Sequence, residues 1–229
     1  MGKKSTKEKI LDAAETLFAQ KGFATTSVRA ITERAGVNLA ALNYHFGSKS
    51  GLIEAVFKRR IDPINQERLE MLRKFEAEAG KKPVPLEKLM EAFLAPALKI
   101  SDKDASTQLF IRLMGRIHME ADSLDSGMKE IAEAKKNIML NFKEVFFVFR
   151  GLLARALPEV DPEELLWRLS FTLGAMAHSM MMVHGKQANP ISEALSFMDN
   201  AAVLSTENED KVLEYLIRYT VSGLRAGCE

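Results

Sequence analysis

The sequence predicts an all-α protein. An N-terminal three-helix helix-turn-helix domain would be followed by a larger C-terminal helical domain. Three observations support this fold class: apolar residues recur every three or four positions along most of the chain, no segment alternates strictly as a half-buried strand does, and glycines separate the first three helical segments. We expect the two domains to cover residues 1–50 and 51–229.

The N-terminal helices are predicted from their caps and their apolar stripes. Gly22 and Gly36 end the first two helices, and Asn38 and Ser48 are N-caps of the next two. The predicted helices cover about residues 6–21, 39–46 and 49–79, and Thr26 or Ser27 caps a second helix that reaches about residue 35.

The rest of the chain is predicted to form a further group of helices. Pro96 should kink the first of them, Pro158 should end the third, and Asp161 followed by Pro162 is typical of a helix start. The predicted ranges are about 85–100, 105–120, 124–156, 161–184 and 208–225, with a short helix at 191–199.

Residues 27–46, SVRAITERAGVNLAALNYHF, have the helix, glycine turn and second helix of a helix-turn-helix motif. With Leu42 at the centre of the buried face, Phe46 falls beside it, and Ala40 and Tyr44 point the opposite way. Small and polar outward residues let a helix approach base edges in the major groove. The predicted contacts to bases and phosphates are Thr26, Ser27, Arg29, Asn38, Leu39, Ala40, Ala41, Asn43, Tyr44, His45 and Lys49.

Charge and composition agree with this interpretation. Residues 1–60 hold eleven Lys and Arg against five Asp and Glu, whereas the remainder is acidic, as expected when one end of a chain meets a polyanion. Apolar residues make up 47% of the chain, with no apolar run long enough to span a membrane, so we expect a cytoplasmic protein. Cys228 is the only cysteine, and no catalytic or metal-ligand spacing is found, so we expect no cofactor, no metal and no enzyme.

The segment ILDAAETLFAQKGFATTSVRAITERAGVNLAALNYHFGSKSGLIEAVF, residues 10–57, resembles the N-terminal domain of the TetR family of repressors. The resemblance implies a homodimer that binds a palindromic operator in double-stranded DNA, with a C-terminal domain that binds a small molecule and releases the DNA. The chain departs from the family pattern at residues 38–41 and at Asn43, so its operator cannot be inferred from relatives.

Two later segments, QLFIRLMGR (108–116) and ELLWRLSFTLGAMAHSM (164–180), are similar to those of PsrA-type, fatty-acid-responsive members of that family. The effector implied is lipophilic, such as a long-chain fatty acid or an acyl-CoA. Arg112, Arg116 and Arg168 lie beside apolar stripes and could hold its acidic group. The candidate pocket residues are Phe110, Arg112, Met114, Met139, Phe142, Phe146, Trp167, Phe171 and Met176.

Apolar stripes on the helices at 161–184 and 208–225 favour a four-helix bundle between two subunits. The candidate interface residues are Leu165, Leu169, Leu173, Leu213, Leu216 and Ile217. Three alternatives stay open: an architectural DNA-binding protein without an effector, a repressor that responds to an aromatic or drug-like ligand, and a helical carrier or enzyme that retains the DNA-binding domain.

Overall fold

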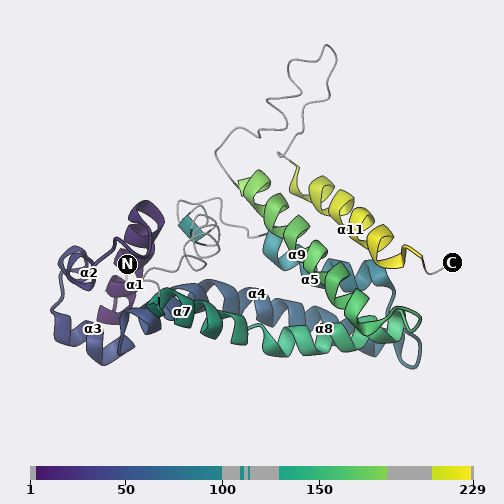
Figure 1. The fold of residues 1–229 in the computed structure, drawn as a ribbon, viewed down its shortest axis with the longest axis horizontal. Coiled ribbons are helices and arrows are strands. Elements are labelled where there is room, and N and C mark those ends of the chain that lie inside the picture. Colours follow the sequence, from purple (N-terminus) through teal and green to yellow (C-terminus); the bar gives the residue numbers. More distant parts are fainter. Residues whose placement is uncertain (1–3, 100–108, 111–112, 114–128, 185–207, 228–229) are drawn as a thin grey trace, which may run out of the picture. The chain divides into compact units, whose positions relative to one another are not determined.

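The computed structural model describes residues 4–99, 109–110, 113, 129–184 and 208–227, and the regular structure in these residues is entirely helical (Figure 1). The all-α prediction is confirmed. The helices are α1 (Thr6–Lys21), α2 (Val28–Ala35), α3 (Leu39–Phe46), α4 (Lys49–Ala79), α5 (Leu86–Leu98), α7 (Lys129–Leu140), α8 (Lys143–Ala156), α9 (Pro162–His184) and α11 (Glu209–Arg225).

Side-chain caps fix where the first three helices begin. Ser5 and Glu8 form a reciprocal capping box on α1, in which Ser5 N donates to Glu8 Oε2 at 2.7 Å and Glu8 N donates to Ser5 Oγ at 3.2 Å. Ser27 and Asn38 accept from backbone amides in the first turns of α2 and α3. Because these signals are local in sequence, the predicted bounds of α1 to α4 agree closely with the structure.

The prediction of one helix over 124–156 is wrong, because the chain forms α7 and α8 with a break at residues 141–142. At the break the amide of Asn141 donates to the carbonyls of both Asn137 and Ile138, at 3.3 and 3.1 Å, and that of Phe142 to Met139 at 3.1 Å. These shorter-range bonds tighten the end of α7 and stop its regular ladder. The predicted helix at 191–199 and most of the one at 105–120 lie outside the described residues.

The chain divides into two compact units. The first unit comprises residues 1–63 and 104–144, and α1, α2 and α3 pack against one another in it. Its core contains a row of aromatic rings, with centroid distances of 5.0 Å between Phe18 and Phe23 and 6.0 Å between Phe23 and Phe57. These rings pack α1 and the segment that follows it against the first part of α4.

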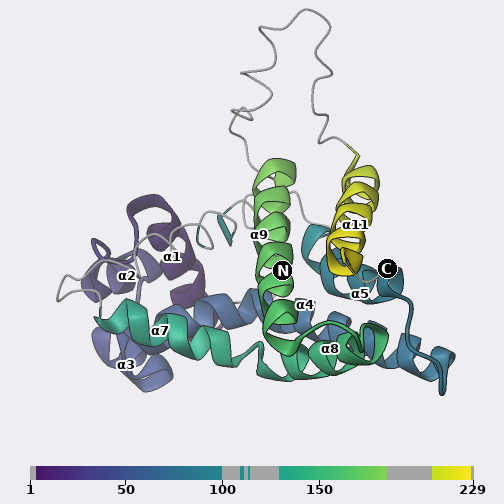
Figure 2. The same cartoon turned by 45° about the vertical axis from the view of Figure 1, so that its right-hand side comes forward.

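The second unit comprises residues 64–103 and 145–229. Two views show α9 and α11 side by side, and both helices also contact α5 (Figures 1 and 2). Phe93 of α5 and Phe149 of α8 stack with their ring centroids 4.4 Å apart, inside a large apolar cluster. Within the described residues, therefore, each unit has a hydrophobic core of its own.

Candidate DNA-binding and effector sites

Helix α3 has one buried and one exposed face. Leu42 is fully buried, whereas Ala40, Asn43 and His45 are exposed and Tyr44 keeps 86% of its surface in solvent. The predicted orientation of this helix is confirmed. At this exposure, most of the ring of Tyr44 can contact another molecule.

The turn that precedes α3 gives this helix its direction. Gly36 has a φ of +66°, a left-handed conformation that side chains disfavour, and its amide donates to the carbonyl of Glu33 at 3.2 Å. Asn38 then starts α3, and its Oδ1 accepts from the amide of Ala41 at 2.8 Å. The cap therefore uses the side-chain oxygen of Asn38, a residue also predicted to contact DNA. Leu39, next along, is exposed and Ala41 is half-buried.

Thr26 has a structural role, which corrects the prediction that its side chain contacts DNA. The residue is only 1% exposed, and its hydroxyl donates to the carbonyl of Gly22 at 2.6 Å, with the carbonyl of Leu17 at 3.3 Å. The neighbouring Ser27 is exposed and caps α2, with Oγ accepting from the amide of Ala30 at 3.1 Å. Ser27 is therefore the residue at this end of α2 that an incoming phosphate can reach.

Two charged candidates flank α3. Arg29 is exposed and pairs with Glu33 one turn along α2, with Nε 3.0 Å from Oε1. Lys49 is half-buried at the start of α4. An exposed pair contributes little to stability, so the guanidinium of Arg29 can exchange its carboxylate for a phosphate at small cost.

Ion pairs join α1 to the first part of α4. The buried carboxylate of Glu15 pairs with Arg59 and Arg60, and Arg60 Nε lies 3.1 Å from Oε1. Asp12 accepts from Arg59 Nη1 and from Lys4 Nζ, both at 2.7 Å. Burial acts to raise the pKa of Asp12, but the hydrogen bonds from Lys4 and Arg59 outweigh it and hold that pKa below its ordinary value.

The described pocket candidates are divided between the two units, with Trp167 and Phe171 of the second unit side by side at 6.1 Å between ring centroids. Four of them, Met139, Phe146, Trp167 and Phe171, are exposed, so they do not line a closed pocket within the single chain. Phe110 is buried in the first unit against Phe57, with ring centroids 6.3 Å apart. Phe142 and Met176 are half-buried, and Arg112 and Met114 lie outside the described residues.

The predicted interface residues also need correction. Leu165, Leu169, Leu213 and Leu216 are each at most 6% exposed and belong to the chain's own core, so they cannot meet a second subunit. Ile217 packs partly against the same core, and only Leu173, at 40%, is exposed.

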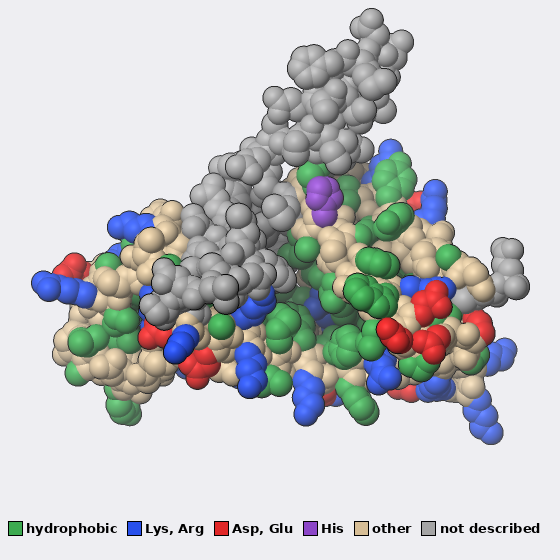
Figure 3. Space-filling view, in the orientation of Figure 1, with side chains coloured by type: hydrophobic (Ala, Val, Ile, Leu, Met, Phe, Trp, Pro, Cys, Tyr) green, Lys and Arg blue, Asp and Glu red, His purple; other side chains and the backbone are tan. Residues whose placement is uncertain are grey.

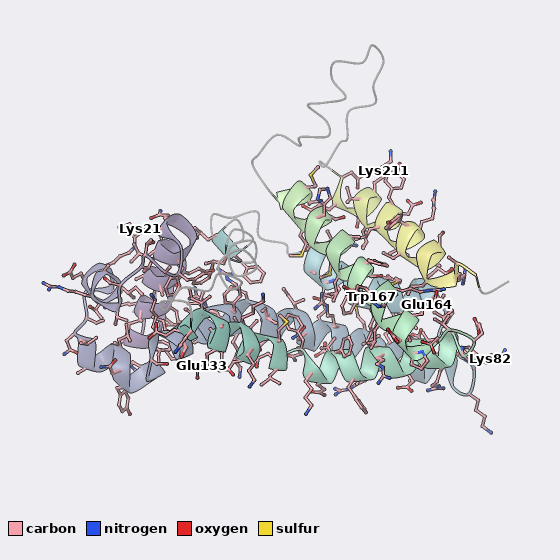
Figure 4. All side chains as sticks on the ribbon, in the orientation of Figure 1. Lys21, Lys82, Glu133, Glu164, Trp167 and Lys211 are labelled. Atoms are coloured by element: carbon pink, nitrogen blue, oxygen red, sulfur yellow. The ribbon has the colours of Figure 1, made fainter. Side chains whose placement is uncertain are left out.

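The opposite faces of α9 and α11 carry apolar side chains that sequence reasoning missed as interface candidates. Trp167 and Phe171 are 59% and 67% exposed, and Figure 4 shows Trp167 on α9. Tyr215 and Tyr219 of α11 are 54% and 69% exposed. Figure 3 shows hydrophobic side chains gathered over these two helices. The signal for this face was present in the sequence, because α9 carries large apolar residues on more than one side.

Arg168 was predicted to be able to hold the acidic group of an effector, but its guanidinium already forms hydrogen bonds within the chain. Its Nη1 donates to the carbonyl of Leu224 at 2.5 Å and its Nη2 to the carbonyl of Ala226 at 2.6 Å, while Glu164 accepts from Nε at 3.2 Å. The guanidinium therefore caps the C-terminal end of α11, where a cation also meets the negative end of the helix dipole. Arg112 and Arg116 lie outside the described residues.

Two family models match the chain. Residues 10–56 match "Bacterial regulatory proteins, tetR family", and residues 91–223, more than half of the chain, match "Tetracyclin repressor-like, C-terminal domain". The chain belongs to the TetR family. This is a family of transcriptional regulators and not a family of enzymes. The match to PsrA-type members in particular is not confirmed.

Curated TetR relatives match mainly in the DNA-binding region. The chain is 54% identical over 52 residues to Probable HTH-type transcriptional regulator YttP of Bacillus subtilis, covering 23% of this chain and 25% of YttP. It is 35% identical over 63 residues to the HTH-type transcriptional repressor KstR2 of Rhodococcus jostii, covering 28% and 31%. The matches thus span about a quarter to a third of these relatives.

Solved TetR-type structures share the fold along nearly the whole chain. NalD of Pseudomonas aeruginosa, described as the secondary repressor of the MexAB-OprM multidrug efflux pump, is 21% identical with a TM-score of 0.60, over 95% of this chain and 94% of NalD. A transcriptional regulator from Rhodococcus sp. Rha1 is 19% identical with a TM-score of 0.53, over 96% and 97%. At these identities the likeness concerns the fold alone.

The described residues contain neither a membrane-spanning helix nor a cluster of metal ligands. None of their helices is both long and apolar enough to cross a membrane. Nor do three or more His, Cys, Asp or Glu side chains gather there in an arrangement that could hold a metal ion.

Proposed function

We propose that this TetR-family protein is a transcriptional repressor that binds a palindromic operator as a homodimer and is released by a small lipophilic effector. The observation that carries the DNA-binding part is the orientation of α3, with Leu42 fully buried and Tyr44 86% exposed. A helix anchored in this way offers its outward residues to the major groove. Several relatives that match in this region carry names of transcriptional repressors, including KstR2.

Recognition would combine apolar and polar contacts. Leu39 and Ala40, both exposed, can touch thymine methyl groups, and the amide of Asn43 can pair with adenine. Tyr44, His45 and Lys49 would contact the phosphate backbone together with Ser27 and Arg29. Base contacts from the start and middle of α3 would therefore give sequence specificity, and phosphate contacts from the surrounding residues would give affinity.

The outward face of α9 and α11 supports the homodimer. Exposed aromatic side chains such as Trp167 and Phe171 are costly to leave in water, and two copies related by a two-fold axis would cover each other's faces. Ser170, Gly174 and Ala177 lie on the same side of α9 and are exposed. Their small size lets a second helix approach closely. A two-fold dimer presents two copies of α3, so the operator should be an inverted repeat.

A lipophilic effector remains the preferred ligand class, with a long-chain fatty acid or an acyl-CoA as candidates. Its support is the broad apolar cluster of the second unit, to which helices α5, α8, α9 and α11 all contribute. Ligand would favour a state of the dimer that fits the operator poorly, and operator DNA would weaken ligand binding by the same factor.

Selection of DNA from a random pool by the full-length protein tests the proposal. We expect enrichment of an inverted repeat with half-sites about one helical turn, ~10 base pairs, or a multiple of it apart. Titration of that complex with a fatty acid and with an acyl-CoA should then release the DNA, as followed by fluorescence anisotropy. If no defined sequence is enriched, the repressor part of the proposal is contradicted. If the protein–DNA complex persists at saturating lipid, the effector part is contradicted.

A further inference from the structure

A single arginine in the second unit, Arg68 on α4, is buried with no acidic partner among the residues that the structure describes. Only 2% of its surface is exposed, and none of the ion pairs found among the described residues includes it. Burial lowers its pKa to about 10, so the guanidinium is still a cation at neutral pH. A buried charge without a counter-ion is unfavourable, and buried charges in proteins are normally paired.

Among the described residues, the contacts of Arg68 are with neutral groups. Its Nε donates to the carbonyl of Phe93 at 2.9 Å, and its Nη1 donates to Oδ1 of Asn65 at 3.2 Å. The guanidinium carbon also lies 4.5 Å from the centroid of the Phe93 ring. These contacts orient the planar group without neutralising it. They come from α4 and α5, so two helices fix the position of the charge.

The third contact of Arg68 is the weakest and the easiest to replace. Nη2 lies 3.4 Å from Sδ of Met176 on α9, and a thioether sulfur is a poor acceptor. Met176 is half-buried, so it lies closer to solvent than Arg68 does. Because a methionine side chain changes rotamer readily, an incoming group can displace Sδ and take its place beside Nη2.

We propose that Arg68 binds the acidic head of the effector, and that this effector is a free carboxylate on an apolar body. This inference rests on the proposed function as an effector-released repressor. A carboxylate offers two oxygens that match the N–H groups of a guanidinium, and it would supply the missing negative charge. Phe93, which contacts Arg68, belongs to a large buried apolar cluster that also includes Leu72 and Leu89, and the body of such a ligand requires apolar surroundings.

The proposal separates the two effector candidates. A fatty acid carries a free carboxylate, whereas the acyl group of an acyl-CoA is a thioester and has no negative charge at that position. Arg68 should therefore select the free acid over its thioester. Sequence reasoning could have found Arg68, because it shares the inward stripe of α4 with Asn65, Leu72 and Phe75 at helical spacing.

Calorimetric titration of the full-length protein, freed of lipid, with dodecanoate and with 1-dodecanol tests the proposal. We expect dodecanoate to bind about 10- to 100-fold more tightly than the alcohol, the range of a charge-assisted hydrogen bond. Arg68→Met should bind both probes with equal affinity, and Arg68→Lys should keep part of the preference. The matched control, Arg73→Met, changes an exposed arginine of the same helix and should behave as the wild type.

Each outcome decides the matter. Equal binding of the two probes by the wild type overturns the role of Arg68, and so does a carboxylate preference that survives in Arg68→Met. If Arg68→Met fails to fold by circular dichroism, the wild type and Arg68→Lys still give the comparison. Release of operator DNA by both probes alike would leave the proposed repressor intact while overturning this inference. Binding of neither probe would overturn this inference together with the lipophilic effector, whereas selection of an inverted repeat would still support the DNA-binding repressor.

Discussion

Glu15 of α1 and Arg60 of α4 form a hydrogen-bonded ion pair, with Oε1 of Glu15 3.1 Å from Nε of Arg60. The side chain of Glu15 is 4% exposed and that of Arg60 27%. Arg59 pairs with the second oxygen of the same carboxylate. One buried acid thus ties two adjacent arginines of α4 to α1, and it contributes to the position of the helices that surround α3.

Replacing Glu15 with Gln should lower the free energy of unfolding by about 1–3 kcal/mol, because charge-assisted hydrogen bonds to Arg59 and Arg60 are lost. Urea denaturation of the full-length protein measures the change. Glu33→Gln is the matched control. Its pair with Arg29 is largely exposed, so we expect a change below about 0.5 kcal/mol. If Glu15→Gln and Glu33→Gln lose the same free energy of unfolding, the buried ion pair stabilises the fold no more than the exposed one.

The ion pairs of Asp12 should make stability depend on pH in the acid range. The pKa of Asp12 in the folded protein lies below its ordinary value, even though burial acts to raise it, because Lys4 and Arg59 stabilise the carboxylate. Since the unfolded pKa is about 3.9, the stabilisation is fully present above that pH and is lost as the pH falls through the lower, folded pKa.

Asp12→Asn tests this linkage. The variant should melt at a lower temperature than the wild type at pH 7, and the difference should shrink as the pH is lowered below about 4. Thermal unfolding by circular dichroism between pH 7 and pH 2.5 gives both curves. Asp62→Asn, at an exposed site of α4, corrects for the change in net charge. A difference between wild type and Asp12→Asn that stays constant over the whole range would argue against the ion pairs.

Tyr44→Ala should weaken operator binding about 10-fold or more while leaving the melting temperature unchanged. The residue is 86% exposed, so its removal disturbs no packing within the chain. Its ring centroid lies 5.2 Å from that of His45, an exposed neighbour, which adds little to stability. Fluorescence anisotropy with the selected operator measures the affinity, and Tyr44→Phe separates the hydroxyl from the ring. Undiminished binding by Tyr44→Ala would remove this residue from the interface.

Lys49→Ala should reduce the salt dependence of binding as well as its strength. A lysine that neutralises one phosphate contributes about 1 to the slope of log K against log salt. Affinities measured from 50 to 300 mM salt give that slope. Lys82→Ala, in the loop between α4 and α5, removes the same charge from the second unit and should leave the slope as it is. Parallel lines for wild type and Lys49→Ala would contradict the assignment.

The helices around α3 could be predicted because their signals are local. Asn38 and Gly36 specify where α3 starts, and Leu42 alone decides which side faces the core. The hydroxyl of Thr26 could not be assigned in this way, because its burial and its two carbonyl acceptors, on Gly22 and Leu17, depend on how the chain folds back after α1. A buried structural threonine and an exposed phosphate-binding one look the same in a sequence.

The second unit was harder to predict for a related reason. Helix α9 is apolar on several sides, so its periodicity identifies Leu165 and Leu169 as one stripe and Trp167 and Phe171 as another without saying which faces the core. That choice depends on packing against α5 and α11. Likewise, no glycine or proline marks the end of α7, so the break before α8 is absent from the local pattern.

Phe171→Glu should convert the dimer to a monomer without unfolding the chain. The ring is 67% exposed in the single chain, so a carboxylate is well solvated there, but a dimer would bury that charge against an apolar partner face. Analytical ultracentrifugation over micromolar concentrations gives the state of assembly. Phe147→Glu is the matched control, because Phe147 of α8 is 76% exposed and lies on neither α9 nor α11. If Phe171→Glu is monomeric, it should also bind a full operator with the weak affinity of a single half-site. If instead Phe147→Glu is monomeric and Phe171→Glu stays dimeric, the interface lies on α8.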